Sequence, residues 1–325
     1  MDNRFKTCDL FAGAGGIRLG FEKAGFDTVF SNDYDEYCAK TYDLNFKQPK
    51  VTVKDIREIN PEEIPDFDVL LAGFPCQPFS TAGYQKGFKD KRNGDLFFEV
   101  IRILREKKPV AVFLENVKNI KSHDDGKTFE TITAELRSAG YKTKDAVLNT
   151  RRYANIPQNR ERAFVLGFLN DVAYDNFSFP KEVELSRKIK DFLDESVDEK
   201  FYYKEYDKIY PILRDAVKFK HTVYQYRQTY VRENKNAVCP TLTANMGGGG
   251  HNVPIILNKK GIRKLTPREC FRLQGFPESF KLPNISASKL YKQAGNSVTV
   301  PLVRRIAKQM KKALSISGGT KPLVL

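Results

Sequence analysis

The sequence contains few cysteines and histidines, and it lacks the spacings at which these residues bind metal or form disulfide frameworks. Its five cysteines are odd in number, and no two of them are spaced as Cys-x-x-Cys. Its three histidines show no ligand spacing among themselves. These absences argue against a structural zinc and against a disulfide-rich secreted fold, and they favour a reducing compartment. We therefore expect no metal site.

Long apolar runs are also missing. The chain has no stretch of 18 apolar residues, and its N-terminus carries no apolar signal region. A membrane-spanning helix needs about 20 consecutive apolar residues. We therefore expect a cytoplasmic protein without a membrane partner.

Positive charge is in excess and is unevenly distributed. The formal net charge is +15 and the pI is about 9.4. Between residues 201 and 264, 12 Lys and Arg stand against 4 Asp and Glu, and nine Phe and Tyr are interspersed. This mixture is typical of a surface that binds phosphates and base edges. A solvated basic surface explains this stretch, taken alone, equally well.

The first half of the chain alternates short apolar strands with amphipathic segments. At 325 residues the chain is long enough for two domains. Repeated β-α units of this length predict a mostly parallel sheet with helices on both faces. We expect its strands at 5–11, 28–31, 51–53, 67–72, 110–114, 143–149 and 162–168.

The alternation stops after Gly167. Residues 170–264 contain the basic, tyrosine-rich stretch and a run of four glycines at 247–250. A helix is expected to begin at Thr266, because Pro267 follows it and Glu269 lies three residues after it. This part of the chain predicts a smaller module made of short strands and loops.

Polar and glycine residues follow the first two expected strands. The turn Gly13–Gly16 reads Gly-x-Gly-Gly, and Asp9 precedes it. A nicotinamide dinucleotide becomes the weaker interpretation, because the full Gly-x-Gly-x-x-Gly is absent and an acidic strand end disfavours pyrophosphate. Asp33 lies where a ribose-binding carboxylate belongs, and Tyr34 could stack on adenine. A helix N-cap for Asp33 and plain packing for Tyr34 are equally good explanations of these residues in isolation.

Cys76 lies on a stiff turn where the fourth expected strand ends. Pro75 and Pro78 lack amide donors and cannot continue a central strand. Ligands bind at the carboxyl ends of strands in open α/β sheets, so Cys76 is a candidate nucleophile. A small buried side chain is the competing explanation. Glu115, at the end of the next strand, would be its acid partner.

The order of these blocks resembles the DNA (cytosine-5) methyltransferases, especially those of bacterial restriction–modification systems. The resemblance covers nearly the whole chain, and no single block carries it. The blocks are Asp9–Gly16, Asn32–Tyr34, Asp55–Ile56, Gly73–Ser80, Glu115–Val117, Gln158–Arg162, Thr266–Phe280 and Gln293–Val298.

The resemblance implies an α/β fold with two domains. A Rossmann-like S-adenosylmethionine-dependent methyltransferase domain, with a mixed, mostly parallel sheet, would comprise residues 1–169 and 284–325. A smaller, mostly β and loop target-recognition domain would comprise 170–283. DNA is expected in the cleft between the two domains.

The implied reaction transfers a methyl group from S-adenosyl-L-methionine to C5 of a flipped-out cytosine, leaves S-adenosyl-L-homocysteine and uses no metal. By resemblance, Cys76 adds to C6 of the base and Glu115 holds or protonates N3. Arg162 contacts the O2 side of the base. Arg160 helps to fix the catalytic loop and a phosphate, although phosphate neutralisation alone is the simpler role.

The resemblance also implies the cofactor contacts. Asp33 would bind the ribose, Tyr34 would stack on adenine and Asp55 would accept the adenine amine. Many relatives have Glu and Trp at the positions of Asp33 and Tyr34, and both substitutions keep the needed chemistry. The full expected set is Phe11, Ala12, Gly13, Gly16, Asp33, Tyr34, Asp55, Ile56, Pro75, Leu96, Asn296, Ser297 and Val298.

The expected DNA contacts fall in two regions. Residues 81–94 are polar and rich in glycine, which suits a mobile loop that closes over DNA. Arg227, Gln228, Tyr230 and Arg232 are hypothesised to contact base edges, although arginine contacts to phosphate are commoner. The remaining expected contacts are Ser80, Gln85, Lys86, Arg92, Thr241, Thr243, Gly247 and Gly248.

Three alternative functions are less well supported by the sequence. A tRNA cytosine-5 methyltransferase could use the same blocks, but the long basic region favours DNA. A catalytically silent DNA-binding relative would not need the reactive residues that are present. The third alternative is a dinucleotide-dependent oxidoreductase. The sequence argues against it, because the Gly-x-Gly-x-x-Gly turn and the catalytic His or Tyr-Lys arrangement of such enzymes are missing. Expected partners are double-stranded DNA and, functionally, a cognate restriction endonuclease, and the enzyme is expected to act as a monomer.

Overall fold

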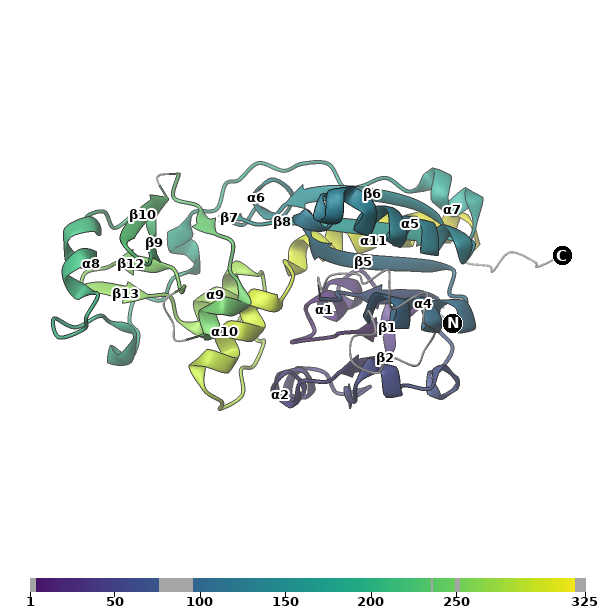
Figure 1. Cartoon of the computed structure of the whole chain (residues 1–325), viewed down its shortest axis with the longest axis horizontal. Coiled ribbons are helices and arrows are strands. Elements are labelled where there is room, and N and C mark those ends of the chain that lie inside the picture. The colour runs from purple at the N-terminus through teal and green to yellow at the C-terminus, as the bar shows by residue number, and fades with distance from the viewer. Residues whose placement is uncertain (1–3, 76–95, 235, 249–251, 319–325) are drawn as a thin grey trace. The chain divides into compact units, whose positions relative to one another are not determined.

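The computed structural model describes residues 4–75, 96–234, 236–248 and 252–318 (Figure 1). Its contacts divide the chain into two compact units. The first consists of Met1–Leu148, Glu161–Pro180 and Val303–Leu325, and the second of Asn149–Arg160 and Lys181–Leu302.

The borders of these units differ from the domain borders drawn on the sequence. Residues 149–160 and 284–302, which the sequence assigned to the catalytic domain, pack within the second unit, and residues 170–180, which it assigned to the recognition domain, pack within the first. Long-range pairing places residues 149–160 there, because β7 (Gln158–Asn159) forms a parallel pair with β11 (Cys239–Pro240).

The first unit is built on a seven-stranded sheet of order β3-β2-β1-β4-β5-β8-β6. Among the described residues, β3, β2, β1, β4 and β5 are mutually parallel, and β8 is antiparallel to β5. The expected mostly parallel sheet is confirmed. The bounds are β1 (Lys6–Leu10), β2 (Asp27–Asp33), β3 (Thr52–Val53), β4 (Val69–Ala72), β5 (Ala111–Val117), β6 (Lys142–Asn149) and β8 (Glu161–Phe168).

Helices cover both faces of this sheet (Figure 1). Alternate strand residues such as Leu70 and Val112 pack into one core with α4 (Leu96–Lys107) and α5 (Lys127–Ser138). On the other face the ring of Phe113 meets Phe21 of α1 (Gly16–Glu22) edge-on, with 5.2 Å between ring centroids. Strands that are buried on both faces consist of continuous apolar runs. These strands could therefore be predicted from the sequence. The remaining helices of this unit are α2 (Glu36–Asn45) and α7 (Asp171–Asn176).

The second unit contains a four-stranded antiparallel sheet of order β10-β9-β12-β13. One face of it packs against α8 (Tyr210–Ala216) around a small core that includes Leu213, Tyr224 and Ile255. The strands are β9 (Val223–Arg227), β10 (Tyr230–Asn234), β12 (Ile255–Leu257) and β13 (Ile262–Lys264). The other helices are α6 (Thr150–Tyr153), α9 (Pro267–Leu273) and α10 (Ala287–Asn296), and α11 (Val300–Ile316) leads back into the first unit.

The predicted helix start at Thr266 is confirmed. The Thr266 hydroxyl accepts from the Glu269 amide, and the Glu269 carboxylate accepts from the Thr266 amide. Glu269 also forms a buried ion pair with Arg263, with 2.6 Å between Nη2 and Oε1. This ion pair connects β13 to the first turn of α9.

Within the described residues, no helix is both long enough and apolar enough to span a bilayer. The same residues contain no group of three or more His, Cys, Asp or Glu side chains arranged to hold a metal ion.

Candidate active site

A glycine turn connects β1 to α1 in the first unit. Phe11, Gly13 and Gly15 all have positive φ angles, of 54°, 56° and 83°. At Gly15 an added Cβ would lie 2.3 Å from the Phe46 ring, so no larger residue fits. Gly15 is thus packed against the interior, whereas Gly13 is half-buried and meets no atom closer than 4.0 Å, so a ligand at the carboxyl end of β1 can approach the backbone at Gly13.

Asp33 lies directly beside this turn. Its Oδ2 accepts a hydrogen bond from the Gly13 amide at 2.8 Å, and its Oδ1 accepts from the Asp35 amide at 2.8 Å. Burial raises the pKa of Asp33, and the two backbone amides oppose that rise. The N-cap of α2 is Asp35, not Asp33, so the capping explanation of Asp33 is wrong. The carboxylate is instead fixed in place at the strand end.

Tyr34 is 71% exposed, so the packing explanation of this residue is wrong. An exposed ring beside a fixed carboxylate offers an apolar face for a flat ligand. This exposure is compatible with the stacking on adenine that the resemblance implies for Tyr34.

Asp55 and Ile56 follow β3. Asp55 accepts from the Arg57 amide and guanidinium, and the Arg57 side chain holds the pKa of Asp55 below its usual range. Asp55 is therefore a charged acceptor that Arg57 already engages. Ile56 is 3% exposed and belongs to the core beneath α4. Of the other expected cofactor residues in this unit, Gly16 begins α1, Ala12 is buried, Pro75 is exposed and Leu96 begins α4.

Glu115 and Arg162 form an ion pair across β5 and β8. The distance between Arg162 Nε and Glu115 Oε1 is 3.0 Å, and the side chains are 15% and 9% exposed. Burial lowers the pKa of Arg162, and the Glu115 carboxylate raises it. The antiparallel register explains this proximity, since Val117 lies opposite Arg162. The structure thus brings together two of the four expected catalytic residues.

The end of β4 is held against Glu115. A Cβ at Gly73 would lie 3.6 Å from Glu115 Oε2 and 3.1 Å from Ile17 Cδ1. The Asn116 side-chain amide donates to the Phe74 carbonyl at 2.9 Å. Sequence reasoning missed this anchor, although its signal was an amide residue directly after Glu115 at the same strand end.

Cys76, the expected nucleophile, lies outside the described residues. Three other cysteines, Cys8, Cys239 and Cys270, are buried, and burial raises the pKa of each thiol. A buried thiol with a raised pKa is a poor nucleophile. None of these three competes chemically with Cys76 for the catalytic role.

Arg160 lies in the interior of the second unit and is 1% exposed. Its guanidinium donates to the Leu242 carbonyl at 2.7 Å, to the Ser297 carbonyl at 2.5 Å and to the Gly295 carbonyl at 3.2 Å. Arg160 therefore joins three segments that are far apart in the sequence. The Arg160 guanidinium thus fixes the positions of these segments through their backbone carbonyl groups.

The same region requires glycine for close packing. A Cβ at Gly295 would lie 2.1 Å from the Thr243 carbonyl carbon, and one at Gly247 would lie 2.7 Å from the Ser288 carbonyl oxygen. The Thr241 hydroxyl donates to the Asn159 carbonyl at 2.6 Å. The segments around 243 and 295 are thus packed backbone to backbone.

The other expected residues of the second unit differ in exposure. Asn296 is exposed, while Val298 and Ser297 are buried, and the Ser297 hydroxyl has no hydrogen-bond partner among the described residues. Arg227, Gln228, Tyr230 and Arg232 are all exposed on the β9–β10 hairpin, and Thr243 and Gly248 are exposed as well. Ser80, Gln85, Lys86 and Arg92 lie outside the described residues.

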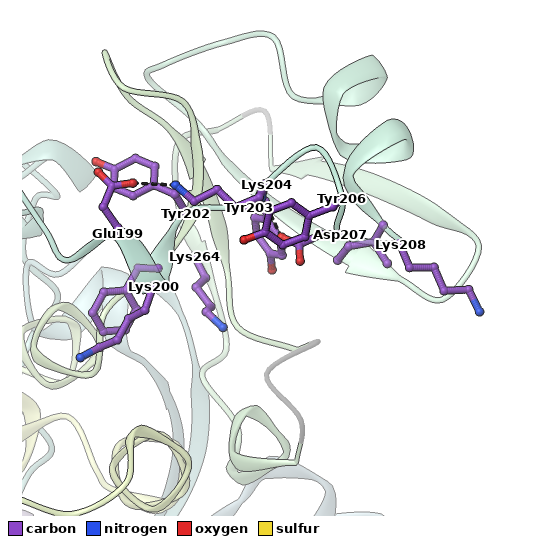
Figure 2. Close-up of a pocket in the computed structure, with 11 residues that line it drawn as sticks. Glu199, Lys200, Tyr202, Tyr203, Lys204, Tyr206, Asp207, Lys208 and Lys264 are labelled. Atoms are coloured by element: carbon purple, nitrogen blue, oxygen red, sulfur yellow. Dashed lines mark hydrogen bonds and ion pairs between the residues drawn. The ribbon is translucent and has the colours of Figure 1, made fainter.

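A surface pocket of about 340 Å³ occupies another part of the second unit (Figure 2). Tyrosine and lysine side chains line it, and Glu199 accepts from both Lys204 and Lys260. It contains none of the expected site residues.

The sequence matches known proteins along nearly its whole length. A family model described as C-5 cytosine-specific DNA methylase matches residues 5–312. The chain is 56% identical to the type II methyltransferase M.Bsp6I of Bacillus sp. (strain RFL6), over 95% of this chain and 99% of that protein. It is 45% identical to the type II methyltransferase M.NlaX of Neisseria lactamica, over 98% and 99%.

Solved structures share the fold. Spodoptera frugiperda DNMT2 superposes with a TM-score of 0.73 at 20% identity, and the match covers 94% of this chain and 99% of that one. A putative DNA modification methyltransferase encoded within an E. coli prophage gives a TM-score of 0.70 at 22% identity, covering 96% and 99%.

Proposed function

Because the chain belongs to the C-5 cytosine-specific DNA methylase family, we propose that it methylates C5 of a flipped-out cytosine within a short, specific double-stranded DNA sequence. S-adenosyl-L-methionine is the proposed methyl donor and S-adenosyl-L-homocysteine the product. The observation that carries the proposal is the buried Glu115–Arg162 pair, which lies against the end of the strand that leads into Cys76.

The first unit fits the proposed cofactor. The fixed Asp33 carboxylate suits ribose hydroxyls, the exposed Tyr34 ring suits an adenine face, and the turn at Gly13 leaves its backbone open. Asp55 retains acceptor capacity on its carboxylate, because each oxygen carries two lone pairs. The bound cofactor would supply an electrophilic methyl group. Phe11, Ala12, Gly16, Ile56, Pro75, Leu96, Asn296, Ser297 and Val298 complete the proposed site.

Cytosine C5 is a weak nucleophile, and the chain must activate it. In the proposed mechanism the Cys76 thiolate forms a bond to C6, which moves electron density onto the ring and makes C5 nucleophilic. Glu115 holds or protonates N3 and stabilises that density. After methylation a base removes the C5 proton, and the C6–sulfur bond breaks to release Cys76.

Two arginines support these steps. Arg162 is proposed to contact O2 of the base, and its ion pair with Glu115 keeps both groups in one orientation. Arg160 is proposed to act at a distance from the base, because its guanidinium is occupied by three carbonyl groups. It would hold the segment at 295–297 in one conformation relative to the segment around Leu242.

The second unit is proposed as the target-recognition domain. Of the predicted domain 170–283, residues 181–283 lie in this unit, and the sequence between 201 and 264 carries a strong basic surplus. Exposed Arg227, Gln228, Tyr230 and Arg232 are proposed base contacts. Thr241, Thr243, Gly247 and Gly248, together with Ser80, Gln85, Lys86 and Arg92, complete the proposed DNA contacts.

We further propose a monomeric enzyme that acts in the bacterial cytoplasm, in functional pairing with a cognate restriction endonuclease. The relatives M.Bsp6I and M.NlaX are named as type II methyltransferases, which supports this setting.

Transfer of a radiolabelled methyl group from S-adenosyl-L-methionine to purified substrates tests the proposal. We expect label in plasmid DNA, recovered as 5-methylcytosine, and none in total tRNA. Label in tRNA with none in DNA would contradict the proposal and support the RNA alternative. Absence of label from both would contradict enzymatic methylation altogether.

A further inference from the structure

The β9–β10 hairpin is a two-stranded antiparallel ribbon. Arg227 lies opposite Tyr230, so only Gln228 and Thr229 form the turn. Gln228 has a positive φ of 53°, and the Tyr226 hydroxyl donates to the Gln228 carbonyl. The turn is therefore held by a side chain of its own ribbon, and β10 is the edge strand of the four-stranded sheet.

The two faces of this ribbon have different chemistry. Tyr224, Tyr226 and Val231 pack into the core with α8. Because side chains alternate along a strand, the opposite face carries Gln225 and Arg227 on β9, and Tyr230 and Arg232 on β10. Tyr230 is 56% exposed, both arginines are exposed and Gln225 is half-buried. We call these four residues the outer face.

The outer face forms two cross-strand rungs. Tyr230 lies opposite Arg227, and Arg232 lies opposite Gln225. Within β9, the Arg227 Nη2 is 3.4 Å from Gln225 Oε1, so the amide of Gln225 orients the guanidinium. None of these four residues is a carboxylate, and the outer face therefore presents two guanidinium groups, one amide and one tyrosine ring.

A two-stranded ribbon fits the major groove of B-DNA, where arginine pairs with guanine and glutamine with adenine. We propose that Gln225 is a specificity-determining residue that reads the base pair next to the one contacted by Arg227. The sequence singled out Arg227, Gln228, Tyr230 and Arg232. It missed Gln225 because only the structure shows that Tyr224 and Tyr226 pack into the core and leave Gln225 on the opposite face. This inference rests on the proposed function, since it names part of the surface that selects the DNA target.

Deep sequencing of bisulfite-treated DNA tests this inference. A library of randomised sites is methylated by the wild-type protein and by Gln225→Ala, Gln225→Glu and Lys259→Ala. Lys259, exposed in the β12–β13 turn of the same sheet, is the control. We expect Gln225→Ala to lose about 10-fold discrimination at one base pair, the order of magnitude that a bidentate side-chain contact to a base supplies. Lys259→Ala should keep the wild-type motif.

The Gln225→Glu variant distinguishes a base-contacting role of Gln225 from a purely structural role. A carboxylate only accepts hydrogen bonds, so we expect its preference at that base pair to move toward cytosine, whose N4 donates. A merely structural role would lower methylation at every site and leave the motif unchanged, and that result would overturn the inference while the proposed function stands. A wild-type protein that methylates no site in the library would overturn both.

Discussion

Asp9 is a buried carboxyl group whose ionisation should set how stability depends on pH. It is 0% exposed, and neither of its carboxyl oxygens has a hydrogen-bond partner among the described residues. Burial raises the pKa of Asp9 from 3.8 to about 8, although Arg18 opposes the rise. An unfolded chain releases this proton near pH 4. Between these two pKa values the folded state therefore binds one proton more than the unfolded state.

The sign and size of the effect follow from proton linkage. The free energy of unfolding should fall as pH rises, by up to about 1.4 kcal/mol per pH unit from this group. Between pH 5 and pH 7 the loss is about 3 kcal/mol. The substitution Asp9→Asn keeps the shape and cannot ionise, so the stability of the variant relative to the wild type should increase by about that amount across the interval.

Urea denaturation of the full-length chain and of Asp9→Asn, at pH 5, 6 and 7, measures this difference. Because both proteins share all other titrating groups, their difference isolates Asp9. A difference that stays constant with pH would refute the reasoning, since it would mean that Asp9 is ionised in the folded protein. A variant that loses stability relative to the wild type on going to pH 7 would refute it as well.

Two further predictions concern the site and its support. Glu115→Gln should lower the methyl-transfer rate by about 10²- to 10⁴-fold, because an amide cannot supply a proton to N3, while DNA binding measured by fluorescence anisotropy is retained. An unchanged rate would remove Glu115 from the mechanism. Gly295→Ala should destabilise the protein by about 1–3 kcal/mol or more, because the new methyl group would lie 2.1 Å from the Thr243 carbonyl carbon. Gly248→Ala, where the nearest atom is 3.4 Å away, is the control for chemical denaturation, and equal stabilities of the two variants would contradict the packing argument.

The sheet of the first unit could be predicted because its strands are buried on both faces. Such strands, for example Val69–Ala72 and Ala111–Val117, leave apolar runs in the sequence whose ends are marked by polar or glycine residues. Asp33 could be located in the same way, because it closes β2. Strand ends on one edge of a parallel sheet converge, so these residues needed no knowledge of distant contacts.

The role of Arg160 could not be predicted in the same way. Only one residue separates it from Arg162, yet Arg162 pairs with Glu115 while Arg160 holds carbonyl groups at Leu242 and Ser297. These partners are 82 and 137 residues away, and no local pattern encodes such pairing. The pairing of β7 with β11 is long-range in the same way.

Cys76 is the centre of the proposed reaction, and its chemistry can be tested in cells. Plasmid DNA from cells that express the wild-type chain, and from cells that express Cys76→Ser, is treated with bisulfite and sequenced. We predict complete C5 methylation at one short motif with the wild type and none with Cys76→Ser. Methylation at the same motif by Cys76→Ser would contradict covalent catalysis by Cys76, and its absence from both samples would contradict methylation of DNA by this protein.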